Sequence, residues 1–354
     1  MKRRLNTHYL KVWELNKMKN IDIIGNTPLV TLTSASHVYA KLECYNPYGM
    51  KDRVAKHMLL KAKKAGILNS ESTIIETSSG TFAQALAFVG RSMGYKVHLV
   101  VDPRIDKMTL RKLKALGVTI DIVEKMDEEG WQGARLKRVK ELLAKDKNMY
   151  WTHQYDNEEN KETYVSLANE LLDENTSIDY LVASVGSGGS LSGTAKRIKE
   201  VYPTCKIIAV DAIGSVIFGQ EHNPKRLQSG LGNGLNPLNV DFDLIDEVHW
   251  LNDSEAYSAT LDLVNKEQIF AGNSSGSVYW VSRWIANNDK GKNVFCIFPD
   301  RGDRYFDTVY NPEFWQLNNL NKIDFEGLAP AEISNSNEKI TNWSFKKQKR
   351  GTAS

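Results

Sequence analysis

The alternation of short hydrophobic segments with amphipathic segments is the feature that most restricts how this chain can fold. Strands are predicted at residues 72–76, 96–101 and 118–123, and helices are predicted at residues 82–93 and 108–116. Strands joined by helices pair in parallel, and the helices then cover both faces of the sheet. This part of the chain is therefore predicted to form a mostly parallel sheet between helices.

A second stretch repeats the pattern after a polar, turn-rich segment at residues 154–160. A helix is predicted at residues 161–172, a buried strand at 180–185, another helix at 190–201 and a strand at 206–210. The polar segment is interpreted as the link between two lobes. We therefore predict an α/β protein with two lobes, each a mostly parallel sheet covered by helices.

The composition fits this prediction and limits the possible partners and cellular compartment. With 354 residues, of which 41% are hydrophobic and 25% charged, the chain is long enough for two cores. A net charge of +3 predicts neither a nucleic-acid partner nor an anionic membrane. Cys44, Cys205 and Cys296 are widely separated, which predicts no disulfide framework and no metal site. A cytoplasmic protein is expected, without a signal peptide or a membrane span.

One lysine stands out by its local sequence. Lys51 follows a Pro/Gly turn within residues 46–53 (NPYGMKDR) and opens a predicted helix. An amine that such a junction aims into a cleft loses solvent, which lowers its pKa and makes it a nucleophile toward carbonyls. A solvated lysine in a first helical turn is the alternative. Polar loops at residues 76–83 and 185–193 also follow predicted strands, and together with Lys51 they would form a phosphate-anchored aldehyde site.

The glycine-rich loop at residues 185–193 lies between a strand and a helix, where free N–H groups and the helix dipole bind anions. A dinucleotide fingerprint needs glycine where Leu191 stands, although Asp211 lies where a ribose-binding acid would, so nicotinamide binding is weakened but not excluded. The lysine of a P-loop is missing after Gly193. The alternative for this loop is a tight turn that needs glycine only for packing. The alternative for the serines of the loops at residues 76–83 and 272–276 is that they are helix N-caps.

Seven short motifs, each a turn or a polar loop, follow one another in the chain: residues 26–29 (NTPL), 46–53, 76–81 (ETSSGT), 154–160 (QYDNEEN), 186–190 (GSGGS), 272–276 (GNSSG) and 299–305 (PDRGDRY). Their order resembles that of the cysteine synthase and cystathionine β-synthase family, the fold-type II pyridoxal-phosphate enzymes. The resemblance covers roughly residues 21–315.

The resemblance implies the roles of individual residues. Lys51 would carry pyridoxal 5′-phosphate as an internal aldimine and then move the substrate α-proton. The implied cofactor-binding residues are Lys51, Thr81, Gly186, Ser187, Gly188, Gly189, Ser190 and Ser274. The implied substrate-binding residues, which would hold the α-carboxylate, are Ser78, Ser79, Gly80, Thr81 and Gln154. Ser274 would face the pyridine nitrogen as a neutral hydroxyl, which suits β-elimination. No metal ligands are implied.

The resemblance also implies how the chain is divided. A large cofactor-binding domain would combine residues 21–51 and 161–315, and a smaller mobile substrate domain would comprise residues 52–160. Residues 1–20 would be an N-terminal extension, and residues 316–354 a polar C-terminal tail that is solvated or loosely attached. Amino-acid substrates and a homodimer are expected.

Some positions depart from the family pattern. Thr81 stands where an asparagine usually hydrogen-bonds the 3-oxygen of the cofactor, and the segment before Lys51 is one residue shorter and lacks a serine. The family's Thr-Gly-Pro-Glu-Ile stretch is replaced by residues 167–171 (LANEL). These departures predict a specialised branch, serving secondary metabolism, rather than the housekeeping cysteine synthase.

The predicted reaction is β-replacement on O-acetylserine, O-phosphoserine or cysteine through an aminoacrylate. Sulfide as the nucleophile would give cysteine, and an amine would give a diaminopropionate derivative. Net β-elimination, as in a cysteine desulfhydrase or serine dehydratase, remains an alternative, and so does a catalytically quiet protein that binds a partner. Arg301 and Arg304 are either contacts to a substrate phosphate or carboxylate, or surface residues.

Overall fold

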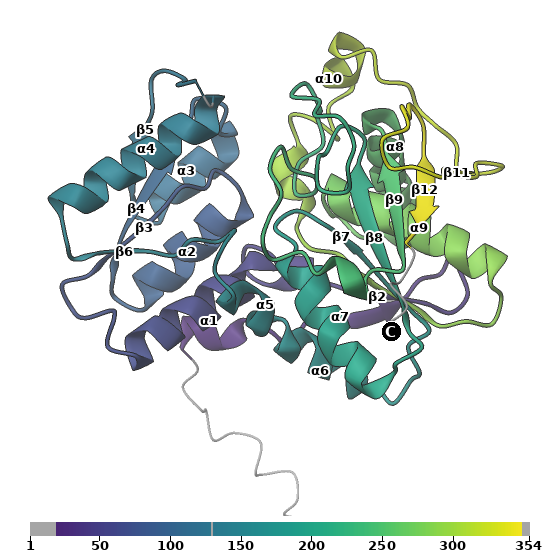
Figure 1. The fold of residues 1–354 in the computed structure, drawn as a ribbon, viewed down its shortest axis with the longest axis horizontal. Helices are drawn as coiled ribbons and strands as arrows, with labels where there is room; N and C mark the ends of the chain where they lie inside the picture. The colour runs from purple at the N-terminus through teal and green to yellow at the C-terminus, as the bar shows by residue number, and fades with distance from the viewer. Residues whose placement is uncertain (1–18, 129, 349–354) are drawn as a thin grey trace, which may run out of the picture.

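The computed structural model describes residues 19–128 and 130–348, which form two lobes side by side (Figure 1). The smaller lobe contains a sheet of four parallel strands in the order β5-β4-β3-β6. These strands are β3 (Thr73–Glu76), β4 (Lys96–Val101), β5 (Thr119–Ile122) and β6 (Met149–Trp151).

The larger lobe contains an eight-stranded sheet in the order β1-β2-β10-β7-β8-β9-β12-β11. Its strands are β1 (Leu29–Thr31), β2 (Val38–Lys41), β7 (Tyr180–Ser184), β8 (Lys206–Ala212), β9 (Glu247–Leu251), β10 (Val294–Ile297), β11 (Ala331–Glu332) and β12 (Ser344–Lys347). Strands β2, β10, β7, β8 and β9 pair in parallel, and β1 and β12 pair antiparallel with the two ends of this central set.

Helices pack against both sheets. The smaller lobe has α1 (Lys51–Lys64), α2 (Thr81–Ser92), α3 (Lys107–Ala115) and α4 (Gly130–Lys145). The larger lobe has α5 (Glu159–Thr163), α6 (Val165–Leu172), α7 (Gly189–Val201), α8 (Asp253–Glu267), α9 (Asn273–Asn288) and α10 (Pro312–Leu317). The short 3₁₀ helices are η2 (Asn20–Ile23), η3 (Glu43–Tyr45), η4 (Phe242–Leu244) and η5 (Gly302–Tyr305). Within the described residues, no helix combines the length and the apolar character that a membrane crossing needs.

The central strands of the larger lobe form its core, and their apolar sequences made this core predictable from the sequence. Every residue of β7 and β10 is buried. Their sequences, Tyr-Leu-Val-Ala-Ser and Val-Phe-Cys-Ile, are almost entirely apolar, as parallel strands need to be when helices cover both faces. Helices α7 and α9 both contact β7, as α2 and α4 both contact β4 in the smaller lobe. The predicted fold class, an α/β protein of parallel sheets covered by helices, is confirmed.

A buried ion-pair network lies where the chain passes from β2 of the larger lobe into α1. Arg53 of α1 pairs with Glu43 at 2.6 Å and with Glu170 of α6 at 2.6 Å, and Lys41 also pairs with Glu170 at 2.8 Å. Asn46 donates to Glu43 at 3.0 Å. Burial alone would raise the pKa of Glu170, but the hydrogen bonds from Arg53 and Lys41 lower it to about 2. The network therefore anchors the start of α1 to the larger lobe.

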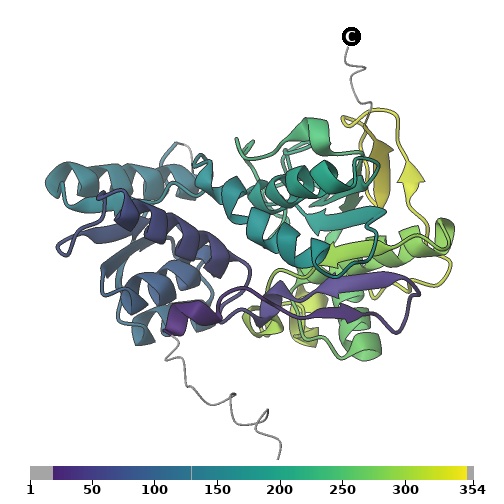
Figure 2. The same ribbon diagram turned by 90° about the horizontal axis from the view of Figure 1, so that it is seen from below.

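The C-terminal part of the chain differs from the prediction. The prediction that residues 316–354 form a solvated or loosely attached tail is wrong for the segment that contains β11 and β12. Strand β12 pairs with β9 and extends the large sheet (Figure 2). Trp343 and Phe345 are only 2% and 7% exposed. In the sequence these two residues are surrounded by polar residues, and the partner strand is distant. The sequence pattern therefore did not predict β12. Residues 1–18 of the predicted extension and residues 349–354 lie outside the described residues.

Trp343 is expected to be essential for this attachment. Its indole Nε1 donates to Nδ1 of His249 at 3.0 Å, and its backbone N–H donates to Glu255 at 2.7 Å. Trp343→Ala removes a large buried side chain, so the free energy of unfolding should fall by about 3–5 kcal/mol in urea titrations. Leu317→Ala is the control, because Leu317 is 82% exposed and its loss should change stability by less than about 0.5 kcal/mol. Equal effects of the two substitutions would contradict a docked C-terminal strand.

Candidate active site

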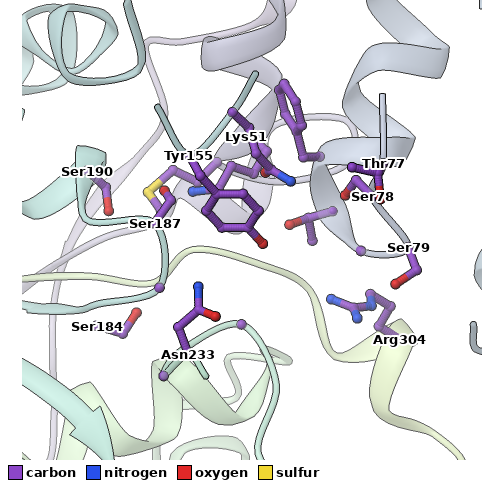
Figure 3. Close-up of a pocket in the computed structure, with 18 of the residues that line it drawn as sticks. Lys51, Thr77, Ser78, Ser79, Tyr155, Ser184, Ser187, Ser190, Asn233 and Arg304 are labelled. Carbon is purple, nitrogen blue, oxygen red and sulfur yellow. The ribbon is translucent and has the colours of Figure 1, made fainter. Parts of the chain in front are cut away.

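One cavity between the two lobes gathers most of the predicted site residues (Figure 3). The predicted residues that line it are Lys51, Ser78, Ser79, Gly80, Thr81, Gln154, Gly186, Ser187 and Ser190. In Figure 3, Lys51 lies between Ser187 on one side and Ser79 on the other. Three other predicted residues, Gly188, Gly189 and Ser274, are not among the residues that line it. The sequence motifs thus converge in space, although they are spread over more than 200 residues.

Lys51 is the first residue of α1 and is partly buried in the cavity wall. The turn before it is fixed by the backbone hydrogen bond from Met50 to Pro299 at 2.8 Å, and Gly49 has a φ of 119°, which favours glycine. The amine Nζ donates to the hydroxyl of Tyr164 at 3.4 Å. Burial lowers the pKa of Lys51 to about 8, although the negative charge of Asp300 opposes this shift. About a tenth of this amine is therefore unprotonated at pH 7, far more than for a solvated lysine.

The glycine-rich loop connects β7 to α7 and presents serine hydroxyls to the cavity. Gly188 has a φ of 85°, and a Cβ there would overlap Val240. A Cβ on Gly189 would overlap the side chain of Asn160. These two glycines are therefore required for packing, as the structural alternative predicted. Ser187 and Ser190, in contrast, line the cavity at the N-terminus of a 13-residue helix, where the helix dipole attracts an anion.

The opposite wall is the loop that leads into α2. Gly80 is the N-cap of this helix and no side chain caps it, so the N-cap alternative for Ser78 and Ser79 is wrong. The N-cap of α9 is likewise Gly272, so the serines that follow it do not occupy the cap position. The hydroxyls of Ser78 and Ser79 are instead placed at the cavity wall, where they can bind a ligand.

A buried carboxylate that sequence reasoning missed holds this loop in place. Glu76, the last residue of β3, accepts hydrogen bonds from the backbone N–H of Thr77 at 2.6 Å and from the indole of Trp151 at 3.1 Å. It also accepts from the hydroxyl of Thr152 at 2.5 Å and from the backbone of Gln154 at 3.3 Å. Glu76 therefore ties the loop before α2 to the segment that carries Gln154.

A second buried network lies behind the cavity in the larger lobe. The hydroxyl of Ser274 lies 3.5 Å from Asp300, and Tyr305 donates to the same carboxylate at 2.7 Å. Burial raises the pKa of Asp300, and the charges of Arg304 and Lys51 oppose the shift. Ser274 lies next to Gly230, which lines the cavity: a Cβ on Gly230 would lie 3.5 Å from the Ser274 hydroxyl. This carboxylate therefore links the positions of Lys51, Ser274 and Arg304 electrostatically.

The structure adds cavity residues that the sequence did not reveal. Tyr155 and Asn233 line the cavity, and so does Arg135, whose position on the charged side of an amphipathic helix gave no signal. Asp211, considered as a ribose-binding acid, is instead fully buried and accepts a hydrogen bond from its neighbour Ala212 at 2.8 Å. Burial raises its pKa to about 7.

The cysteines do not provide an alternative nucleophile. Cys44, Cys205 and Cys296 are all buried and free. Burial raises the pKa of each thiol to about 12, so the nucleophilic thiolate is scarce at neutral pH. The amine of Lys51 is the better nucleophile toward a carbonyl.

The cavity residues fit a cofactor that is both an aldehyde and a phosphate ester. Lys51 supplies an amine of lowered pKa, and Ser187 and Ser190 at the start of α7 supply an anion site. Thr77 also lines the cavity, and its buried Oγ1 has no hydrogen-bond partner within the described structure. Buried polar atoms are normally hydrogen-bonded, so this unpaired hydroxyl is consistent with a polar ligand in the cavity.

Comparison with known proteins agrees with this chemistry. The family model described as "Pyridoxal-phosphate dependent enzyme" matches residues 21–300, which is most of the chain. The protein belongs to this family of pyridoxal-phosphate-dependent enzymes, and the predicted cofactor is confirmed at the level of the family.

Solved structures of fold-type II enzymes share the fold. An O-acetylserine-dependent cystathionine β-synthase from Helicobacter pylori is 32% identical, with a TM-score of 0.76, and the match covers 83% of this chain and 98% of that one. A hydrogen sulfide-producing enzyme from Fusobacterium nucleatum is 29% identical, with a TM-score of 0.76 and coverage of 81% and 97%. An O-ureido-L-serine synthase is 26% identical, with a TM-score of 0.77 and coverage of 84% and 98%.

The lowered pKa of Lys51 gives a testable pH dependence. In cofactor-free protein, the rate of cofactor capture should rise with pH and reach half of its maximum near pH 8, because only the neutral amine attacks an aldehyde. Stopped-flow absorbance at several pH values measures this rate. In Asp300→Asn the midpoint should move below 8, because the carboxylate that favours the ammonium form is gone. A wild-type midpoint above pH 10, as for a solvated lysine, would contradict the environment described for Lys51.

Proposed function

We propose that this protein catalyses β-replacement on an activated serine or on cysteine, in the manner of cysteine synthase. The observation that carries the proposal is the placement of Lys51 between the serines of the α7 loop and the serines that precede α2. This arrangement has an anion site on each side of one amine. A phosphorylated cofactor and an amino-acid carboxylate would therefore be held on opposite sides of the base.

The larger lobe would hold the cofactor. Ser187, Ser190 and the free N–H groups at the start of α7 would bind its phosphate, and Lys51 would bind its aldehyde carbon. Ser274 would face the pyridine nitrogen, and Thr81 would approach the 3-oxygen in place of the family's asparagine. When bound, pyridoxal phosphate accepts the electrons of the bond broken at Cα, and this is the chemistry that the protein itself lacks.

The smaller lobe would hold the substrate. The hydroxyls of Ser78 and Ser79, together with the N–H groups at the start of α2, would bind the α-carboxylate, and Gln154 would approach it from the segment between β6 and α5. Glu76 fixes the positions of both segments. Because these segments lie on the smaller lobe and Ser187 on the larger, substrate binding would draw the lobes together and exclude water.

Lys51 would move the α-proton. Its pKa of about 8 is close to physiological pH, where a general base is most effective, and Tyr164 orients its amine by a 3.4 Å hydrogen bond. The proton taken from Cα would reside on Nζ while the β-substituent leaves, and it would return to Cα after the nucleophile has added.

Net elimination is the second candidate, because the Fusobacterium nucleatum relative at 29% identity is described as producing hydrogen sulfide. The two reactions share the residues above until the β-substituent has left. They then differ in whether a second nucleophile or water completes the reaction. The identity of the products therefore distinguishes them.

The proposal predicts a product that depends on the nucleophile. Holoenzyme given O-acetylserine, O-phosphoserine or cysteine should form a β-substituted alanine only when sulfide or an amine is present, as measured by mass spectrometry. Lys51→Ala should lower turnover by about 10²–10⁴-fold because it removes the base. Lys63→Ala, at an exposed position of the same helix, should leave turnover unchanged.

Two results would contradict the proposal. Pyruvate formed at the same rate with and without a nucleophile would establish elimination instead. Bound cofactor without turnover of any of these donors would identify a catalytically quiet protein.

A further inference from the structure

Two arginines flank the Ser79–Gly80 step at the edge of the cavity. Arg135 of α4 donates from Nη1 to the hydroxyl of Ser79 at 3.4 Å. Arg304 of η5 points toward the same step, and its Nη1 lies 3.6 Å from the position that a Cβ on Gly80 would occupy (Figure 3). Both side chains line the cavity, one from each lobe. The proposed cofactor and α-carboxylate sites use neither of them.

Arg304 has hydrogen-bonding capacity to spare. It is 17% exposed, and its ion pairs to Asp106 at 3.6 Å and Asp300 at 3.9 Å are longer than hydrogen bonds. Its Nε has no hydrogen-bond partner within the described structure. Buried guanidinium groups normally have an anion at hydrogen-bond distance. Because Arg304 has none that close among residues 19–128 and 130–348, it could pair with an anionic ligand.

The guanidinium group of Arg135 is also incompletely paired. It is 13% exposed and lies 3.3 Å from Asp102, but that carboxylate already accepts two hydrogen bonds from Arg104 at 3.0 and 3.1 Å. The Nε of Arg135 also lacks a partner among the described residues. Neither guanidinium group is therefore fully paired with carboxylates of the protein, and both side chains line one part of the cavity.

The position of this pair identifies the group that it would bind. The loop before α2 is assigned to the α-carboxylate, so a second anion beside Ser79 and Gly80 would belong to the substituent on the substrate β-carbon. An acetyl ester is neutral and would add no anion to these two nearly buried cations, whose carboxylate neighbours are shared with another arginine or lie beyond hydrogen-bond distance. A phosphate monoester is a dianion whose oxygens match the planar donors of two guanidinium groups.

We propose, on the basis of the β-replacement function above, that Arg135 and Arg304 bind the phosphate of a phosphorylated donor, O-phosphoserine. In the elimination stage the Cα proton passes to Lys51 and the electron pair of the Cα–H bond forms a Cα=Cβ double bond. The Cβ–O bond breaks, and its electron pair leaves with inorganic phosphate. The two guanidinium groups stabilise the negative charge that grows on the leaving oxygen. Because one arginine comes from each lobe, the phosphate also favours the closed arrangement of the lobes.

The test compares two donors in the holoenzyme and its variants. Wild type should prefer O-phosphoserine to O-acetylserine in kcat/KM. Arg135→Gln and Arg304→Gln should each lower kcat/KM for O-phosphoserine by about 10- to 100-fold, the loss expected for hydrogen bonds to a charged group, and change the value for O-acetylserine less than 3-fold. Arg135→Lys and Arg304→Lys keep the positive charge but lose the planar pair of N–H donors. Their kcat/KM for O-phosphoserine should lie between the values of wild type and the glutamine variants. Arg301→Gln is the matched control, because Arg301 is 52% exposed and pairs with Asp303.

A binding measurement separates this inference from the proposed function. Titration calorimetry of the wild-type holoenzyme with inorganic phosphate should show binding that both glutamine variants weaken and Arg301→Gln retains. Turnover of O-acetylserine with no phosphate binding and no effect of the arginine variants would overturn the subsite but leave β-replacement intact. Arginine variants that raise only the KM of a carboxylate-bearing nucleophile would also overturn it. No turnover of either donor, with arginine-dependent phosphate binding, would support the subsite and reject the proposed reaction.

Discussion

The buried ion pairs of Arg53 with Glu43 and Glu170 are the interaction on which the rest of the site depends. Arg53 lies two residues after Lys51 in α1, so its anchoring to the larger lobe fixes where the lysine stands. Removing charges from water is costly, and loss of one partner would leave an uncompensated buried charge. The network therefore makes the start of α1 rigid even though the helix continues into the smaller lobe.

Each lobe supplies a different part of the chemistry, and the residues between them complete it. The larger lobe contributes the anion site at the start of α7, and the smaller lobe contributes the serine loop before α2. Lys51 lies where the chain passes from β2 into α1, and Gln154 lies where it passes from β6 into α5. Asp300 connects these parts in the larger lobe, since its charge acts on both Lys51 and Arg304. Binding, proton transfer and lobe closure are thus properties of one connected site.

The sequence revealed the parts of the fold and site that depend on local patterns. Lys51 and the loop at residues 186–190 follow turns or buried strands, where backbone geometry restricts residue type. Arg135 could not be found in this way, because its helix carries many charged residues and only tertiary packing turns this one toward the cavity. β12 was missed because its pairing with β9 joins segments almost 100 residues apart. Glu170 belongs to residues 167–171, which depart from the family pattern, and its pairing with Arg53 could not be read from that local sequence.

The central claim is that Lys51 binds the cofactor covalently. Reduction of the purified holoenzyme with sodium borohydride, followed by proteolysis and mass spectrometry, identifies the lysine that carries the pyridoxyl group. The account predicts the modification on the peptide that contains Lys51 and its loss in Lys51→Ala. Modification of a different lysine, or none in a protein that retains its bound cofactor, would contradict the account.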